Sequence, residues 1–239
     1  MPEVRPFRAL RYEPEIVGDL AAVISPPYDL ITPADAAQLL ARHARNAVRL
    51  DLPLDEQGDG PDDRYRRAAR TFAAWRSDGT LRKDPRPSLY VYEADRESNG
   101  PVERTQRGFF GRLRLEPLGP DSGVLSEEPP ASAPRDDRYK LLRATGVNTS
   151  PVVVVFNDPG GEAHRILEAA ARPNPIVDVR DGQGVRHRMW PLAADGPDAA
   201  AVAGLIAVVA SAPVGLVDGR RRYESALRYR DERRMSRSC

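Results

Sequence analysis

Residues 214–224 read Val-Gly-Leu-Val-Asp-Gly-Arg-Arg-Arg-Tyr-Glu in a chain of 239 residues. A short apolar run stops at Asp218-Gly219, three arginines follow, and Ala226-Leu227-Arg228 continues the segment toward Arg234. This order predicts a strand, a tight turn and the first turns of a helix. Gly219 permits a positive φ at the turn, and the backbone N–H groups of a helix start point toward any ligand above it.

The arginines after the turn suggest an anion site. A guanidinium binds two phosphate oxygens at once, so Arg220, Arg221 and Arg222 suit a ligand that carries phosphate. Residues 218–239 hold eight arginines and four acidic residues, and such a composition is equally typical of a solvated, arginine-rich helix. Both interpretations stay open at this point.

The composition is that of a globular protein with a sizeable core, because 41% of the residues are hydrophobic and 30% are charged. The net charge of +1 does not by itself imply a polyanionic partner. Cys239 is the only cysteine, which excludes a disulfide framework and a cysteine-based metal site. The chain shows no secretion signal and no membrane-length apolar run, so we expect a cytoplasmic protein.

The first part of the chain predicts alternating strands and helices. Thr32-Pro33 has the pattern of an N-cap followed by proline at the first helical position. Tyr65, Ala68, Phe72 and Trp75 lie three or four residues apart, as on the buried face of an amphipathic helix. We expect a strand ending at Val23-Ile24, helices over 33–44 and 63–77, and strands over 46–52, 88–93 and 107–115, the last two antiparallel.

A stiff loop follows the first of these strands, in Ser25-Pro26-Pro27-Tyr28-Asp29. Proline fixes its own φ and pushes the residue before it into an extended conformation. Tyr28 and Asp29 therefore project from a rigid loop, where a substrate-binding residue is often found. A plain turn accounts for the same residues, and this alternative stays open.

The second part opens with a loop over 117–134 that is rich in Pro, Gly, Ser and Glu, and we interpret it as a domain boundary or an active-site loop. Its paired acids, Glu127 and Glu128, are candidates for a general base or a metal-bound carboxylate, and Glu127 is also a candidate substrate-loop residue. A surface acidic loop is the simpler account. We expect helices over 136–145, 162–172 and 198–211, a C-cap at Gly146, a buried central strand over 150–157, and a hairpin of 175–179 with 185–192.

Several well-known sites are excluded by their missing motifs. The chain has no glycine-rich loop ending in Lys-Ser/Thr, no dinucleotide fingerprint and no Gly-x-Ser-x-Gly elbow. His43, His164 and His187 are scattered singly, so no pair has the spacing of metal ligands. We therefore assign no metal site from the sequence.

Eight segments occur in a fixed order: Pro6-Phe7-Arg8-Ala9-Leu10-Arg11-Tyr12, Ser25-Pro26-Pro27-Tyr28-Asp29, Asn46-Ala47-Val48-Arg49-Leu50, Leu89-Tyr90-Val91-Tyr92-Glu93, Arg107-Gly108-Phe109, Asp137-Arg138 to Ser150-Pro151, Arg186-His187-Arg188, and Asp218-Gly219-Arg220-Arg221-Arg222-Tyr223-Glu224. In this order they resemble the bacterial and archaeal family called domain of unknown function 1015. The resemblance covers nearly the whole chain, and the family has no settled biochemical activity.

The second half looks like the ParB/sulfiredoxin superfamily, which includes a nucleotide-dependent free-serine kinase. Gly146-Val147-Asn148-Thr149-Ser150-Pro151 matches its Gly-x-x-x-Pro strand, and Asp218-Gly219-Arg220-Arg221-Arg222 matches its phosphate turn. The resemblance implies an α/β fold with mixed sheets, with an N-terminal α/β portion at 1–118 and a ParB/sulfiredoxin-like portion at 119–239. It implies that Gly219, Arg220, Arg221, Arg222, Tyr223 and Glu224 bind nucleotide phosphates, that Glu128 is the catalytic base, and that Asp218 helps to hold Mg²⁺.

The chain departs from these relatives in three respects. The common His-Glu of the acidic loop is Glu127-Glu128, and Asp-Gly-His-His-Arg is replaced by a turn with three arginines. Arginine keeps anion binding but cannot act as a neutral acid, base or metal ligand as imidazole can. Relatives usually continue well past the phosphate turn, whereas this chain stops fifteen residues after Glu224, so we expect it to be shortened at its C-terminus.

By this resemblance we expect phosphoryl transfer from ATP or ADP with Mg²⁺ to a small, serine-like hydroxyl metabolite. One alternative is a non-catalytic ParB-like module that binds nucleotide or DNA, and another is an inactive, shortened family member. We do not expect DNA as the partner, because the chain shows no basic face with interleaved aromatic residues.

Overall fold

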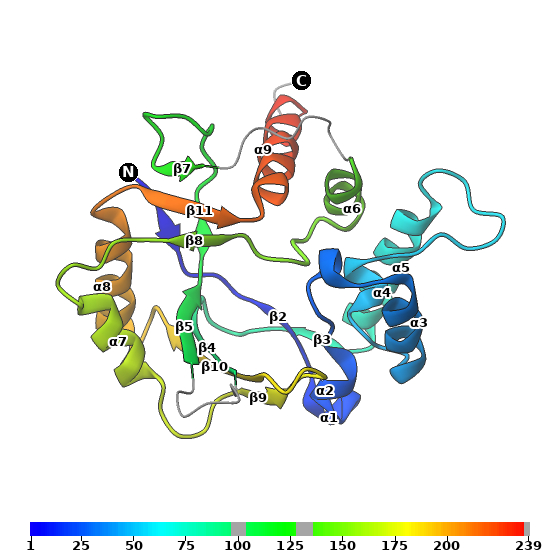
Figure 1. The fold of residues 1–239 in the computed structure, drawn as a ribbon, viewed down its shortest axis with the longest axis horizontal. Coiled ribbons are helices and arrows are strands. Elements are labelled where there is room, and N and C mark those ends of the chain that lie inside the picture. Colours follow the sequence, from blue (N-terminus) through cyan, green and yellow to red (C-terminus); the bar gives the residue numbers. More distant parts are fainter. Residues whose placement is uncertain (97–103, 128–135, 237–239) are drawn as a thin grey trace. The chain divides into compact units, whose positions relative to one another are not determined.

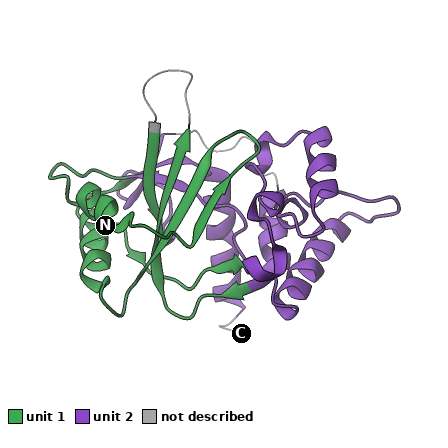
Figure 2. Cartoon of the chain, turned by 90° about the horizontal axis from the view of Figure 1, so that it is seen from below, with its two compact units in different colours: residues 1–12, 82–114, 156–214 green, residues 13–81, 115–155, 215–239 purple. Residues whose placement is uncertain are grey.

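An antiparallel sheet with the strand order β5-β4-β10-β9 is the centre of the first of two compact units (Figure 1). The computed structural model describes residues 1–96, 104–127 and 136–236. Each unit combines three separate stretches of chain (Figure 2): unit 1 has Met1–Tyr12, Arg82–Arg114 and Phe156–Val214, and unit 2 has Glu13–Leu81, Leu115–Val155 and Gly215–Cys239. The mixed α/β fold is confirmed. The sequential parts 1–118 and 119–239 divide the chain differently and stay a prediction.

Unit 1 buries the centre of its sheet under two helices. Leu89, Tyr90 and Val91 of β4 are fully buried, and α8 packs against both α7 and β10. In chain order its elements are β1 (Val4–Arg5), β2 (Leu10–Tyr12), β3 (Leu81–Lys83), β4 (Ser88–Arg96), β5 (Arg104–Phe110), β6 (Arg112–Leu113), α7 (Glu162–Ala170), β9 (Val177–Arg180), β10 (Arg186–Ala193) and α8 (Ala199–Ala210). The first residue of β3, Leu81, is counted with unit 2.

Both predicted antiparallel pairs of unit 1 are confirmed, with one interruption. The strand expected over 107–115 changes partner at Gly111, because β5 pairs with β4 whereas β6 pairs with β1. A Cβ atom on Gly111 would lie 2.7 Å from Val4 Cγ1. A glycine at this position therefore leaves room for the buried side chains of Val4 and Leu89 where the chain changes partner.

Unit 2 is mainly helical and carries a small sheet with the order β7-β11-β8. The helices predicted over 33–44 and 63–77 are α3 and α5, and a capping box between Thr32 and Asp35 starts α3. The elements are α1 (Pro14–Val17), α2 (Leu20–Val23), a 3₁₀ turn (Tyr28–Leu30), α3 (Pro33–Arg42), α4 (Val48–Asp51), α5 (Asp63–Ser77), β7 (Val124–Ser126), α6 (Asp137–Thr145), β8 (Val153–Val155), β11 (Val214–Asp218, from residue 215) and α9 (Arg220–Met235).

Two predicted strands of unit 2 are helical turns. The strand expected to end at Val23-Ile24 is α2, and the strand expected over 46–52 is α4. Asn46 explains both corrections: its Oδ1 accepts from Val48 N at 3.0 Å, and its Nδ2 donates to Ala22 O and Ile24 O at 2.9 and 3.1 Å. The bond to Val48 N is local and competes with a strand ladder at the start of α4, whereas the bonds to Ala22 O and Ile24 O engage carbonyls that a strand at 22–24 would need for its own ladder.

The strand predicted over 150–157 forms as β8, but it is neither central nor buried. It lies at one edge of the sheet β7-β11-β8, and Val153 and Val155 are 45% and 54% exposed. The β-branched run thus reflects strand propensity rather than burial. The predicted strand, turn and helix around Gly219 are confirmed as β11 and α9.

No helix within the described ranges is both long enough and apolar enough to cross a membrane. The cytoplasmic location stays a prediction.

We predict that Asn46→Ala lowers the free energy of unfolding by about 3 kcal/mol, because it leaves buried backbone groups without partners at about 1–3 kcal/mol each. Urea unfolding followed by circular dichroism measures this change. The matched control, Thr32→Ala, removes a solvent-exposed N-cap and is expected to cost about 1 kcal/mol. Equal losses in the two variants would contradict the role given to Asn46.

Candidate functional site

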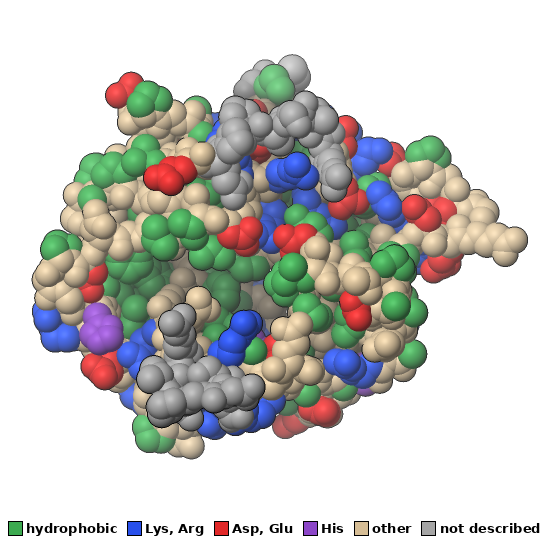
Figure 3. All heavy atoms as spheres, viewed as in Figure 1, with side chains coloured by type: hydrophobic (Ala, Val, Ile, Leu, Met, Phe, Trp, Pro, Cys, Tyr) green, Lys and Arg blue, Asp and Glu red, His purple; other side chains and the backbone are tan. Residues whose placement is uncertain are grey.

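Unit 2 gathers four segments around the ring of Tyr28: the loop before α3, the end of α4, α6 with the loop that follows it, and the start of α9. Basic side chains lie beside acidic ones over the region of α6 and α9 (Figure 3). We call the cluster the Arg138–Arg222 site; its residues are Tyr28, Asp51, Arg138, Thr149, Ser150 and Arg222.

The Tyr28 ring lies against two guanidinium groups. Arg138 Cζ is 3.9 Å from the ring centroid and Arg222 Cζ is 5.7 Å from it, both within the range of cation–π attraction. Burial raises the pKa of the Tyr28 hydroxyl, and the two positive charges only partly oppose this effect. The ring therefore stays neutral at pH 7 and attracts both guanidinium groups.

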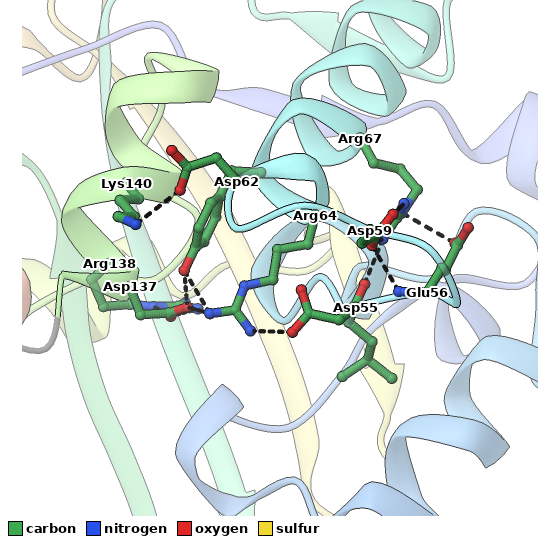
Figure 4. Close-up of polar contacts among 11 residues, drawn as sticks. Asp55, Glu56, Asp59, Asp62, Arg64, Arg67, Asp137, Arg138 and Lys140 are labelled. Carbon is green, nitrogen blue, oxygen red and sulfur yellow. Dashed lines mark hydrogen bonds and ion pairs between the residues drawn. The ribbon is translucent and has the colours of Figure 1, made fainter.

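Arg138 is fixed by a network that reaches back into α5 (Figure 4). Its side chain is only 9% exposed, and Nε and Nη2 donate to Asp137 Oδ2 at 2.9 and 2.7 Å. Asp137 Oδ1 in turn accepts from Tyr65 Oη at 2.8 Å and from Arg64 Nη2 at 3.1 Å. Burial alone would raise the pKa of Asp137, but the hydrogen bonds and charges of its partners outweigh burial and lower that pKa.

Asp51 supports Arg138 from the other side. This carboxylate, at the end of α4, belongs to a residue that is 6% exposed, and it accepts from Arg138 Nη1 at 3.2 Å. Thr149 Oγ1 donates to Asp51 Oδ1 at 2.7 Å, and Ser150 Oγ lies 2.7 and 2.9 Å from the two carboxylate oxygens. A buried charge requires such partners, so Asp51 joins α4, α6 and the loop after α6.

Arg222 completes the site from the first turn of α9. Its side chain is 11% exposed, and Nη2 donates to Asp218 Oδ2 at 2.5 Å. The buried Nε has no hydrogen-bond partner among the described residues. Gly219 has φ +89°, and a Cβ atom there would lie 2.7 Å from Arg222 Nε. Glycine is therefore needed both for the turn and for the arginine to fold back over the helix start.

A small cavity opens between these segments. Its volume is about 30 Å³, and its polar lining includes Arg138, Thr149, Ser150, Arg222 and Ser225. This volume holds about two water molecules. A nucleotide would thus reach it only with the end of its phosphate chain, and the sugar and base would lie outside. Among the described residues no side chain caps α9 at Gly219, and the positive end of the helix dipole lies at this turn.

The predicted phosphate-turn residues have different surroundings. Arg220 Nε donates to Glu224 Oε1 at 2.8 Å, Arg221 is exposed, and only the third arginine lines the cavity. Tyr223 is buried, and its hydroxyl binds both the N–H and the carbonyl of Glu116 at 2.8 Å. It therefore has a structural role in the core of unit 2.

Of the other predicted site residues, some lie in the Arg138–Arg222 site and others lie outside it. Tyr28 is in the site, whereas Asp29 beside it is exposed. Asp218 pairs with Arg222, and its side chain is 59% exposed. Glu127 is exposed just after β7, and Glu128, the predicted base, lies outside the described residues. The roles given to these acids stay predictions.

Sequence reasoning assigned no role to Asp51, Arg138, Thr149 or Ser150. The last three lie in segments that carry the family resemblance, but a single sequence does not show which of their side chains point inward. Asp51 lies in the predicted strand 46–52, at a polar position of the alternating sequence Val48-Arg49-Leu50-Asp51-Leu52, so nothing in the pattern marks it as buried. Among residues 1–96, 104–127 and 136–236, no three His, Cys, Asp or Glu side chains gather as a metal site would require.

We predict that Asp137→Asn weakens the dependence of stability on acid pH. The pKa of Asp137 is lower in the folded chain, so its contribution is fully present above about pH 4 and is lost as the pH falls through the folded-state pKa. Melting temperatures between pH 7 and pH 2 test this, with exposed Asp29→Asn as the control. A curve for Asp137→Asn that runs parallel to the wild-type curve over the whole range would contradict the prediction.

The comparisons with known proteins identify the family. The chain belongs to the family described as protein of unknown function (DUF1015), whose model matches residues 4–238. Neither the search of curated proteins nor the search of solved structures gave a match.

Proposed function

We propose that this member of the DUF1015 family binds the phosphate end of a nucleotide in the Arg138–Arg222 site and transfers a phosphoryl group to a small hydroxyl metabolite. The observation that carries the proposal is the pair of largely buried arginines, which contact one tyrosine ring and line one cavity together with the hydroxyl groups of Thr149, Ser150 and Ser225. Arginine is the residue best suited to bind phosphate oxygens at a partly buried site.

The available donors support an anionic ligand. Arg222 Nε is a buried donor that finds no partner within residues 1–96, 104–127 and 136–236, and a buried donor is costly unless a ligand accepts from it. The N-terminus of α9 adds the positive end of the helix dipole. Phosphoryl transfer depends mainly on positioning and charge stabilisation, and fixed guanidinium groups provide both.

ATP or ADP with Mg²⁺ is the proposed ligand. Mg²⁺ in such sites is usually held by phosphate oxygens, water and one or two carboxylates. Asp218 fits this requirement, because its carboxylate is more than half exposed and lies at the start of α9. Glu128 as the base and a serine-like acceptor follow from the superfamily resemblance alone, which is a weaker argument than site geometry.

Thermal unfolding of the purified chain with ATP, ADP or CTP, with and without Mg²⁺, tests the binding step. A ligand at a hundred times its Kd adds about 2.7 kcal/mol of stability, which corresponds to a rise in Tm of about 5–10 °C for a chain of this size. We expect Arg222→Ala to lose most of this rise. Arg221→Ala, which changes the exposed neighbour, is expected to keep it.

A sharp transition that no nucleotide moves would overturn the proposal, as would an equal rise in Tm in wild type and Arg222→Ala. The transfer step is tested separately, by following ADP formation from ATP with free serine and with other small hydroxyl compounds. Nucleotide binding without any product would leave the site as a non-catalytic nucleotide-binding module.

A further inference from the structure

Ser150 and Asp51 have the geometry of a nucleophile and its base. Ser150 Oγ lies 2.7 Å from Asp51 Oδ1 and 2.9 Å from Oδ2, within the distance over which a carboxylate takes a proton from a hydroxyl group. A base of this kind also needs a third group that orients it. Thr149 Oγ1 and Arg138 Nη1 both donate to Asp51 Oδ1 and meet this need.

The backbone on both sides of this pair is constrained. Pro151 restricts Ser150 to an extended conformation, which limits the direction of the hydroxyl group. Asp51 ends α4, and the buried amide of Asn46 ties the start of α4 to the carbonyls of Ala22 and Ile24. The hydroxyl and the carboxylate are therefore held in place by the fold.

Ser150 also lines the cavity between Arg138 and Arg222. Phosphate oxygens that enter this cavity come close to the Ser150 hydroxyl and to both guanidinium groups. The same arrangement provides a nucleophile, a base and the positive charges that a transferring phosphoryl group requires. If Ser150 served only to hold the loop after α6 in place, its hydrogen bonds to Asp51 would be sufficient, and it would not need to line this cavity.

We propose that Ser150 itself accepts the phosphoryl group from a nucleoside triphosphate, with Asp51 as the base; this inference rests on the proposed function. The Asp51 carboxylate takes the proton of the Ser150 hydroxyl, and Ser150 Oγ forms a bond to the γ-phosphorus. The bond from the γ-phosphorus to the oxygen shared with the β-phosphate breaks, and its electron pair leaves with the nucleoside diphosphate. Arg138 and Arg222 stabilise the charge on the transferred group.

The test incubates the full chain with Mg²⁺ and ATP labelled in its γ-phosphate, and then measures the mass of the intact chain and maps the labelled peptide. We expect one phosphoryl group per chain, on Ser150. Ser150→Ala is expected to abolish the label, and Asp51→Asn is expected to slow labelling by about 10²–10⁴-fold, the usual contribution of a general base. Ser211→Ala, at the end of α8, is the matched control and keeps the label.

The outcomes separate this inference from the proposed function. A label that persists in Ser150→Ala, or that maps to another residue of the wild-type chain, contradicts the inference. If ATP raises the Tm of the same sample but no label forms, nucleotide binding stands and the role of Ser150 is wrong. If ATP changes neither the Tm nor the mass, both proposals fail. Because peptide mapping uses the wild-type chain, the result does not depend on the folding of any variant.

Discussion

The buried carboxylate of Asp51 joins parts of unit 2 that are distant in sequence. Its partners Arg138, Thr149 and Ser150 are 87, 98 and 99 residues away along the chain. Burial of a negative charge is costly, and these hydrogen bonds offset that cost only when α4, α6 and the following loop are all in place. The direction of the Arg138 side chain therefore depends on this carboxylate, and so does its position over the Tyr28 ring.

The two arginines of the site are supported independently. Arg138 is also held by Asp137, which Tyr65 and Arg64 of α5 bind, whereas Arg222 folds back because Gly219 leaves room for it. A site whose cations are fixed in advance loses little entropy when an anion binds, and it stabilises developing charge without rearrangement. This arrangement suits phosphate recognition better than a solvated cluster of surface arginines would.

Local sequence patterns predict those elements whose causes are local. The apolar spacing of α5 and the Asp-Gly break before α9 are sufficient to predict these two helices, because each signal depends only on residues within one or two helical turns. Turn α2 differs from the strand predicted there because Asn46, more than 20 residues away along the chain, binds the carbonyls of Ala22 and Ile24. Turn α4 depends on the local hydrogen bond from Val48 N to Asn46 Oδ1, which the alternating pattern of residues 46–52 does not reveal. Similarly, the sequence could not separate Arg222 from Arg220 and Arg221, since the phase of α9 and the room above Gly219 decide which one turns inward.

The most direct test of the central claim is a crystal structure of the full chain with a non-hydrolysable ATP analogue and Mg²⁺. Our account predicts terminal phosphate oxygens within hydrogen-bond distance of Arg222 Nε and close to Ser150 Oγ, with the sugar and base outside the cavity. A nucleotide bound elsewhere on the chain, with the Arg138–Arg222 site unchanged, would contradict it.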